Sequence, residues 1–151
     1  IQEWVSYYGL EGVYVSFSGG KDSTVLLHIA RELYPNIKAL YIDTGLEYPE
    51  VKQFVKTWDN VDIIRPKMSF KQVIEKYGYP VISKEQSQYI YQYRNAKSEK
   101  TKETRLNGNK WGRGKISNKW KYMLDAPFKI SDQCCNVMKK NPAQEYEKKI
   151  M

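Results

Sequence analysis

The sequence predicts an α/β domain of three layers (α/β/α), in which a mostly parallel sheet lies between two layers of helices. Segments rich in β-branched and aromatic residues alternate along the chain with segments whose apolar residues recur at helical spacing. Such alternation is typical of a parallel sheet whose strands are joined by crossover helices. With 151 residues, the chain is long enough for one domain with a hydrophobic core and too short for two ordinary domains.

Three short strands are expected, and they cover residues 13–17, 39–42 and 61–64. The first enters the turn Gly19–Gly20, and the second enters the turn Asp43–Thr44–Gly45. Ligands of open α/β sheets bind outside the carboxyl ends of the strands, so both turns should face one pocket. The alternative interpretation of the second turn is a plain polar connection, because Asp and Gly are common turn residues.

Helices are expected around these strands, at residues 1–8, 23–33, 49–58, 69–77, 83–94 and 132–140 and from 142 onward. Pro35 ends the second of these helices, whereas Pro49 lies where a first helical turn accepts proline. Ser69 and Ser83 are each followed three residues later by glutamine, a spacing that predicts capping boxes.

The composition favours a folded, cytoplasmic protein. Apolar residues make up 41% of the chain, and no low-complexity tract dominates. No apolar run approaches the roughly 20 residues that cross a bilayer, and the first residues lack the pattern of a signal peptide. The chain begins at Ile1 and stops within an expected helix, so we interpret it as one domain, residues 1–151, truncated at its C-terminal end.

The positive charge is concentrated in one segment. Between Tyr93 and Lys121 there are ten Lys or Arg residues against two acidic ones, which equals the net charge of +8 of the whole chain. The segment at about 95–118 lacks apolar periodicity and contains three glycines, so we expect a flexible basic insertion there, mobile from about Lys97 to Ser117. A lid over a ligand is the favoured interpretation, and a nucleic-acid contact through Trp111, Trp120 and the basic residues is the alternative.

The segment SFSGGKDS predicts a phosphate-binding turn between the first strand and the next helix. It consists of Ser16, Phe17, Ser18, Gly19, Gly20, Lys21, Asp22 and Ser23. The glycines let the backbone approach an anion, the helix N-terminus offers N–H groups, and Lys21 adds a positive charge. A Walker loop is excluded, because Val15 stands at its first glycine and Asp22 follows the lysine. The alternative is an ordinary glycine-rich turn.

This motif resembles the PP-loop of the adenine-nucleotide alpha-hydrolase-like superfamily, the ATP pyrophosphatases. Within it, the chain is most similar to the phosphoadenosine phosphosulfate (PAPS) reductase family. Three further segments carry the resemblance: YIDTGLEYPEV at 41–51, GYPVISKEQS at 78–87 and ISDQCCNVMKKNP at 130–142. The resemblance implies that residues 16–23, Tyr41, Asp43, Thr44, Glu47 and Lys139 bind the nucleotide, and that Lys21, Asp22 and Ser23 act in catalysis.

Cys134 and Cys135 are the only cysteines, and a disulfide between neighbours is strained. The resemblance implies that adjacent cysteines of this kind hold half of an iron–sulfur cluster, which needs four thiolates. Such a cluster would require cysteines beyond Met151. The alternative is a pair of small buried thiols. If the pair holds half of a cluster, it should lie near the pocket at the strand ends, at the start of a helix capped by Ser131, where the helix N-terminus lowers the thiol pKa. If the pair is structural, at least one thiol should be buried in apolar surroundings and face away from the PP-loop.

Three functions remain open. The first is a PAPS reductase-family enzyme, which binds PAPS, APS or ATP for reductive or sulfur-transfer chemistry. The second is an ATP pyrophosphatase that adenylates an acceptor, because the intact Ser-Gly-Gly-Lys-Asp-Ser loop suits cleavage between the α and β phosphates. The third is a nucleotide- or nucleic-acid-binding module without turnover.

The expected ligand is an adenosine nucleotide, ATP or PAPS, with magnesium as a candidate companion. The expected partners are a sulfur-relay or reductant protein and, through the basic insertion, nucleic acid, but no membrane.

Overall fold

Three parallel strands in the order β1-β2-β3 form the sheet: β1 (Tyr14–Ser16), β2 (Lys38–Ile42) and β3 (Val61–Ile64). Val15 pairs with Ala39, and Leu40 pairs with Asp62. β1 is shorter than expected, yet the pairing continues beyond it, because the N–H of Phe17 donates to the carbonyl of Leu40 at 2.8 Å. All three carboxyl ends therefore lie at the same edge of the sheet, as expected.

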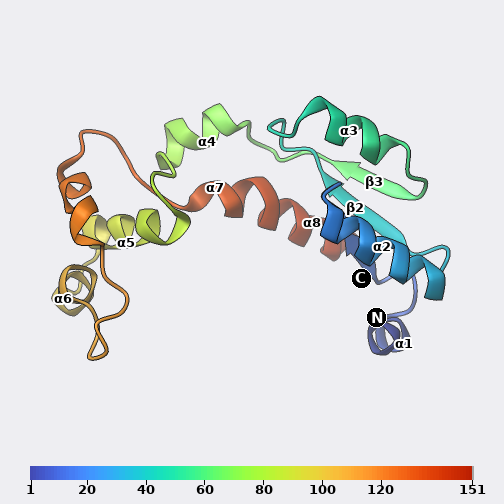
Figure 1. The fold of residues 1–151 in the computed structure, drawn as a ribbon, viewed down its shortest axis with the longest axis horizontal. Coiled ribbons are helices and arrows are strands. Elements are labelled where there is room, and N and C mark those ends of the chain that lie inside the picture. Colours follow the sequence, from blue (N-terminus) through green and yellow to red (C-terminus); the bar gives the residue numbers. More distant parts are fainter. Residues whose placement is uncertain (151) are drawn as a thin grey trace. The chain divides into compact units, whose positions relative to one another are not determined.

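The structure, a computed structural model, describes residues 1–150 and forms two compact units. The first unit contains the sheet and combines residues 1–70 with the chain from Val137 onward. The second unit comprises residues 71–136. Figure 1 shows the elements of both in sequence colours. No helix among the described residues is long and apolar enough to cross a bilayer.

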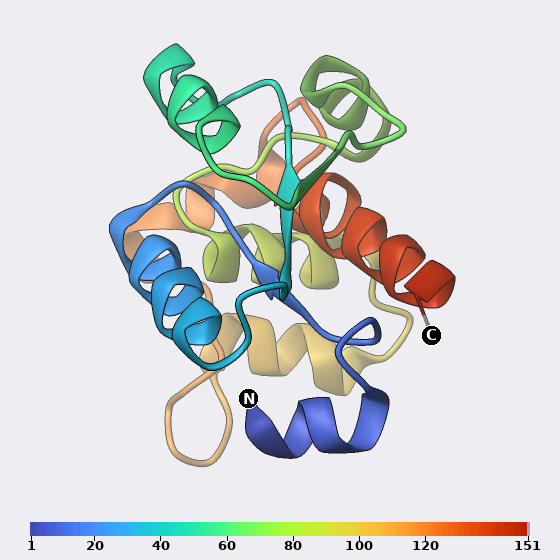
Figure 2. The same ribbon diagram turned by 90° about the vertical axis from the view of Figure 1, so that its right-hand side faces the viewer.

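Helices cover both faces of the sheet in the first unit. On one face lie α2 (Lys21–Leu33) and α3 (Pro49–Lys56), which bury Leu27, Ala30 and Val55 against Val15 and Tyr41 of the strands. On the other face lies α8 (Asn141–Ile150), drawn in red in Figure 2. The predicted three layers are thus present around this small parallel sheet. The short helix α1 (Gln2–Tyr8) precedes β1.

Two tyrosines attach α8 to the sheet. The hydroxyl of Tyr14 in β1 donates to Oε1 of Glu147 in α8 at 2.8 Å, and the hydroxyl of Tyr146 in α8 donates to Asp62 in β3. The rings of Tyr14 and Tyr146 meet edge to face, with centroids 5.3 Å apart. These contacts join the C-terminal helix to both outer strands, although more than 80 residues of sequence separate the partners.

Helices alone make up the second unit, apart from one isolated bridge between Tyr79 and Ile130. Its elements are α4 (Phe70–Tyr77), α5 (Lys84–Asn95), α6 (Glu99–Asn107), the 3-10 helix η1 (Asn118–Asp125) and α7 (Gln133–Cys135). The first residue of α4, Phe70, is the last residue of the first unit before the chain enters the second. The core of the second unit consists of Ile90, Ile116 and Ile130, against which Trp120 packs. The predicted cap of α5 is confirmed, since Ser83 Oγ accepts from the N–H of Gln86 at 3.2 Å.

The segment 95–118 is more ordered than the sequence suggested. We expected no regular element there, but it contains α6 and the buried side chain of Ile116. Arg105 of α6 donates to Gln92 Oε1 at 2.7 Å and to the Gly114 carbonyl at 2.6 Å, and its guanidinium lies 4.4 Å from the ring centroid of Tyr89. Polar contacts hold α6, so apolar periodicity could not reveal it. Mobility of the segment in solution stays a prediction.

The C-terminal helices are also continuous where two separate helices were expected. α7 runs directly into the π-helix η2 (Asn136–Lys140), which is followed at once by α8. Pro142 is the second residue of α8 and directly follows the π-helix η2. A proline in this position therefore does not separate the two helices.

Arg94 of α5 holds the chain at the end of η1 and directly after it. Its guanidinium donates to the carbonyls of Leu124, Phe128, Met123 and Ala126 at 2.7–3.0 Å. Lysine cannot make this planar set of bonds. We expect Arg94→Lys to lower the free energy of unfolding by about 2–3 kcal/mol, the usual range for lost hydrogen bonds to a charged group. Urea denaturation followed by tryptophan fluorescence measures the change.

The control for this experiment is Arg113→Lys, because Arg113 is exposed and only its backbone is hydrogen-bonded within the described residues. The control should unfold like the parent protein. Equal stability of both variants would show that the four carbonyl contacts contribute little.

Candidate functional site

The turn between β1 and α2 packs closely against α3. Gly19 has a φ of 73°, which favours glycine, and a Cβ atom there would lie 2.8 Å from Cγ1 of Val51 and 2.9 Å from Cγ2 of Val55. Gly20 differs, because its φ is −80° and a Cβ atom would meet only Ser18 Oγ at 3.4 Å. The two glycines therefore have different roles: Gly19 allows the close approach to α3, and Gly20 is the N-cap of α2.

Two serines set the shape of this turn. The N–H of Ser18 donates to Ser23 Oγ at 3.2 Å, and the two hydroxyl oxygens are 3.0 Å apart. Ser23 Oγ in turn donates to the carbonyl of Gly20 at 2.9 Å. The N–H of Gly20 reaches Ser18 Oγ at 3.4 Å. The side chains thus fold the loop back onto the start of α2.

The remaining backbone donors of the turn are free. Within residues 1–150, the N–H groups of Gly19, Lys21, Asp22 and Ser23 have no protein acceptor. They lie at the N-terminus of a 13-residue helix, where the helix dipole favours an anion. The side chain of Lys21 is exposed beside them. This arrangement can bind phosphate or sulfate oxygens.

A cavity of about 340 Å³ lies beside the turn, at the carboxyl ends of β1 and β2. Its lining comprises Ser16, Phe17, Ser18, Leu40, Tyr41, Ile42, Glu47, Lys139, Lys140 and Ala143. All of them belong to the first unit. The lining combines apolar residues with Lys139, Lys140 and Glu47, and the apolar surface with two lysines suits a ligand that has a flat apolar part and an anionic part.

Asp43, which directly follows β2, is buried and has three partners. Its Oδ1 lies 2.7 Å from Lys52 Nζ and accepts from the N–H of Gly45, while its Oδ2 accepts from Arg65 Nε at 3.2 Å. The hydrogen bond from Lys52 holds the pKa of Asp43 below its usual value, with smaller contributions from Gly45 and Arg65, against the opposing effect of burial. The carboxylate therefore joins the ends of β2 and β3 to α3.

Glu47 and Tyr41 form the other polar part of the cavity. Glu47 accepts from the N–H of Thr44 at 3.1 Å and from its hydroxyl at 2.6 Å, so its carboxylate is held in place. The hydroxyl of Tyr41 is buried and has no hydrogen-bond partner among the described residues. Burial, helped by the charges of Glu47 and Asp43, raises the pKa of Tyr41 to about 12, so this hydroxyl stays protonated.

Comparison with known families agrees with this geometry. The sequence model of the phosphoadenosine phosphosulfate reductase domain matches residues 12–89, which is more than half of the chain and includes the turn, β2 and Glu47. The chain belongs to this family. It is therefore a member of the nucleotide-binding PP-loop superfamily that the turn at 16–23 predicted, and we call that turn the PP-loop from here on.

Two relatives are longer proteins. An uncharacterized protein of Methanocaldococcus jannaschii is 40% identical over 70 residues, which cover 43% of this chain and 17% of the relative. A probable FAD synthase of Caenorhabditis elegans is 42% identical over 62 residues, which cover 36% of this chain and 12% of the relative. The chain thus matches less than a fifth of each relative. No solved structure matches it.

The structure brings some of the expected site residues of this PAPS reductase-family domain into one cavity. Those that line it are Ser16, Phe17, Ser18, Tyr41, Glu47 and Lys139. The others do not line it: Gly19, Gly20, Lys21, Asp22 and Ser23 belong to the PP-loop, and Asp43 and Thr44 follow the end of β2. Ile42 and Lys140 also line the cavity, as the strand end around Tyr41–Asp43 and the paired lysines suggested, whereas Leu40 and Ala143 were not expected there. The alternation of β2 could have indicated Leu40, but only the fold brings Ala143 there.

The described residues offer no ready magnesium site. Asp43 is already paired with Lys52 and Arg65, and Glu47 accepts two hydrogen bonds from Thr44. Asp22 is exposed in the first turn of α2. Within residues 1–150, no three His, Cys, Asp or Glu residues are grouped so that they could hold a metal ion. The residues therefore do not fit a bound magnesium ion by themselves, and we derive no step through one.

The cysteines differ from expectation in their acidity. Both are half-buried, and Asp132 rather than Ser131 is the N-cap of α7, although Ser131 Oγ accepts from the N–H of Gln133 at 3.4 Å. Burial, together with the neighbouring Cys135, raises the pKa of the Cys134 thiol. The lowered pKa expected of a cluster site is therefore not found at Cys134, because burial has the largest influence on its pKa. An iron–sulfur cluster stays a prediction, since two thiols do not fit one without further ligands.

The ion pairs of Asp43 predict a pH dependence of stability. A carboxyl whose pKa is lowered in the folded protein stabilises it above the unfolded value of about 3.9, and that contribution is lost as the pH falls through the folded value. We expect Asp43→Asn to cost about 2 kcal/mol of unfolding free energy at pH 7 and to flatten the loss of stability below about pH 4. Urea titrations at several pH values measure both effects.

The matched control is Asp59→Asn, because Asp59 is exposed and makes no side-chain ion pair within residues 1–150. It should keep the acid-induced loss of stability. If Asp43→Asn shows the same pH profile as this control, the ion pairs do not stabilise the site.

Proposed function

We propose that this domain binds ATP, cleaves it between the α and β phosphates, and transfers the adenylyl group to an acceptor. The observation that carries the proposal is the set of four unpaired N–H groups at the PP-loop beside Lys21. Several donors at one helix N-terminus suit contiguous phosphates better than a single anionic group. The cavity at the strand ends would then hold the adenosine part.

In this proposal the chain's own residues bind and neutralise the leaving group. An oxygen of the acceptor attacks the α phosphorus, the bond from that phosphorus to the bridging oxygen breaks, and pyrophosphate leaves with the electron pair. The free N–H groups and Lys21 would stabilise the charge that develops on the pyrophosphate. Ser23 would keep the loop in shape through its bonds to Ser18 and Gly20, and Asp22 would favour the start of α2.

The probable FAD synthase among the relatives supports the choice of reaction. FAD contains an AMP group joined through a phosphoanhydride, so a synthase of FAD forms a bond to an adenylyl group. The similarity covers 36% of this chain and only 12% of that relative, so the acceptor used by this protein is not inferred from it.

Reduction of a sulfonucleotide is the second candidate. The name of the family and the adjacent cysteines Cys134 and Cys135 favour it. The raised pKa of Cys134 opposes it, because the thiolate is the reactive form. The basic side chains Lys139 and Lys140 suit either nucleotide.

Product analysis separates the two reactions. The protein is incubated with ATP carrying a label in the α phosphate, with magnesium present, and the products are resolved. Under the proposal, labelled AMP or an adenylylated acceptor accumulates together with an equal amount of pyrophosphate. Formation of ADP and phosphate would contradict it. Release of sulfite from PAPS in the presence of a dithiol, without turnover of ATP, would establish the second candidate instead.

Lys21→Ala should weaken ATP binding about tenfold or more, because one charge-assisted contact contributes about 1.5–3 kcal/mol. Isothermal titration calorimetry with ATP measures the change. Lys56→Ala is the control, since Lys56 is exposed in the last turn of α3 and does not line the cavity. Equal ATP affinities of the two variants would show that Lys21 does not contact the nucleotide.

The two glycines provide a second, steric test. Gly19→Ala places a Cβ atom under 3.0 Å from two valines of α3 at a positive φ, so the PP-loop must shift. Gly20→Ala has room and an ordinary φ. We expect ATP affinity to fall at least tenfold in Gly19→Ala and to change less than threefold in Gly20→Ala. The reverse order would show that the observed loop is not the binding conformation.

A further inference from the structure

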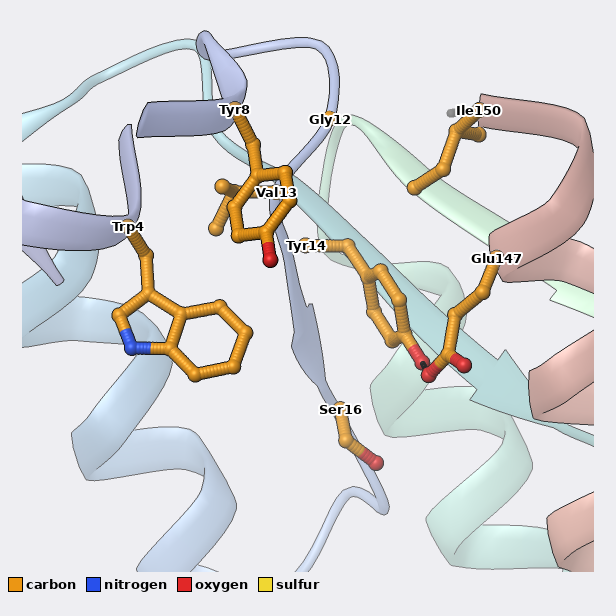
Figure 3. A pocket seen from close by; sticks show the side chains of 8 residues that line it. All are labelled: Trp4, Tyr8, Gly12, Val13, Tyr14, Ser16, Glu147 and Ile150. Atoms are coloured by element: carbon orange, nitrogen blue, oxygen red, sulfur yellow. Dashed lines mark hydrogen bonds between the residues drawn. The ribbon is translucent and has the colours of Figure 1, made fainter. Parts of the chain in front are cut away.

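A second cavity, of about 430 Å³, lies in the first unit on the side of β1 that faces α1 and α8 (Figure 3). Its lining consists of Trp4, Tyr8, Gly12, Val13, Tyr14, Ser16, Glu147 and Ile150. Neither the family match nor the proposed function gives it a role. Its volume is within the range of small-molecule sites.

Aromatic rings line one side of this cavity. The rings of Trp4 and Tyr8 lie together in Figure 3, with centroids 5.8 Å apart, and both are largely exposed, Trp4 by 63% and Tyr8 by 47%. The ring of Tyr14 lies across from them. Rings that are held in place yet remain exposed can bind a flat ligand or a cation with little further ordering.

A single carboxylate gives this aromatic cavity its charge. Glu147 is the only charged residue in the lining. Its Oε1 accepts from the hydroxyl of Tyr14 at 2.8 Å, whereas its Oε2 has no hydrogen-bond partner among the described residues. Tyr14 thereby holds the carboxylate in one orientation and leaves one oxygen for a ligand. An anionic ligand would be repelled, so this is not a second phosphate site.

We propose that this cavity binds a planar organic cation, whose ring lies against Trp4 and Tyr8 and whose charged N–H group donates to the free oxygen of Glu147. A ring that carries an amidinium or a protonated amine has this chemistry. Ser16 lines both this cavity and the PP-loop cavity, so the two ligands would lie next to each other. The proposal does not depend on the reaction proposed above.

Three probes of nearly equal shape test the charge preference: benzamidine, which is a cation, benzamide, which is neutral, and benzoate, which is an anion. Each is titrated into the protein, and binding is measured by ligand-observed NMR. We expect benzamidine to bind at least tenfold more tightly than benzamide, and benzoate not to bind. Equal binding of all three, or no binding of benzamidine, overturns the proposal. Equal binding of the three probes would mean that the cavity does not discriminate by charge and is only an apolar surface, such as one that another polypeptide segment covers.

Two variants locate the probe. Glu147→Gln keeps an acceptor for Tyr14 but removes the charge, so benzamidine should bind about tenfold more weakly while benzamide is unaffected. Trp4→Ala, at an exposed position, should weaken both probes. Glu145→Gln is the control, because Glu145 lies on the same helix but pairs with Lys67 outside the cavity. Unchanged benzamidine binding in Glu147→Gln and Trp4→Ala would place the probe elsewhere and overturn the proposal.

A titration of Glu147→Gln with ATP keeps the two proposals separate. ATP binding should be unchanged in this variant, since Glu147 does not line the PP-loop cavity. If the protein binds benzamidine in this way but does not bind ATP, the proposal of a cation site stands and the proposed function is contradicted.

Discussion

The PP-loop keeps its shape because it packs directly against α3 at Gly19. The space between Gly19 and the valines of α3 is too small for a side chain, so the loop cannot move toward the helix or exchange this residue for a larger one. The same approach brings α3 to the carboxyl ends of the strands, where Lys52 reaches Asp43. The N–H groups at the start of α2 have no protein acceptor within residues 1–150 and remain free for an anion.

α8 imposes a second constraint, because it contributes to the cavities on both sides of Ser16. Ala143, from its first half, and the preceding Lys139 and Lys140 line the PP-loop cavity, whereas Glu147 and Ile150 line the aromatic one. Its position depends on two tyrosine hydroxyls that donate to carboxylates across the sheet. Burial and these carboxylates raise the pKa values of Tyr14 and Tyr146, so the hydroxyls keep the protons that the contacts require.

The sequence was most informative where local chemistry determines structure. The strands, the Gly-Gly turn and the cap at Ser83 depend on neighbouring residues, and each could be placed within a few positions. Contacts between distant segments could not be predicted in this way. Lys52 and Arg65 become partners of Asp43 only when α3 and β3 are in place, and Ala143 reaches the site only through the packing of α8. α6 was missed because Arg105, rather than an apolar face, holds it.

The PP-loop cavity and the aromatic cavity have opposite charge, and this difference restricts what each can bind. Lysines and free N–H groups make the PP-loop side suitable for anions, whereas Glu147 is the only charge on the aromatic side. Since Ser16 separates them, a nucleotide and a cation in neighbouring cavities would attract rather than repel each other. An anionic molecule in the second cavity would meet both the carboxylate and the nucleotide's phosphates. The arrangement therefore favours a positively charged ligand next to the nucleotide. Glu147 of α8 supplies the negative charge for this preference, and the same carboxylate attaches α8 to β1 through the hydroxyl of Tyr14.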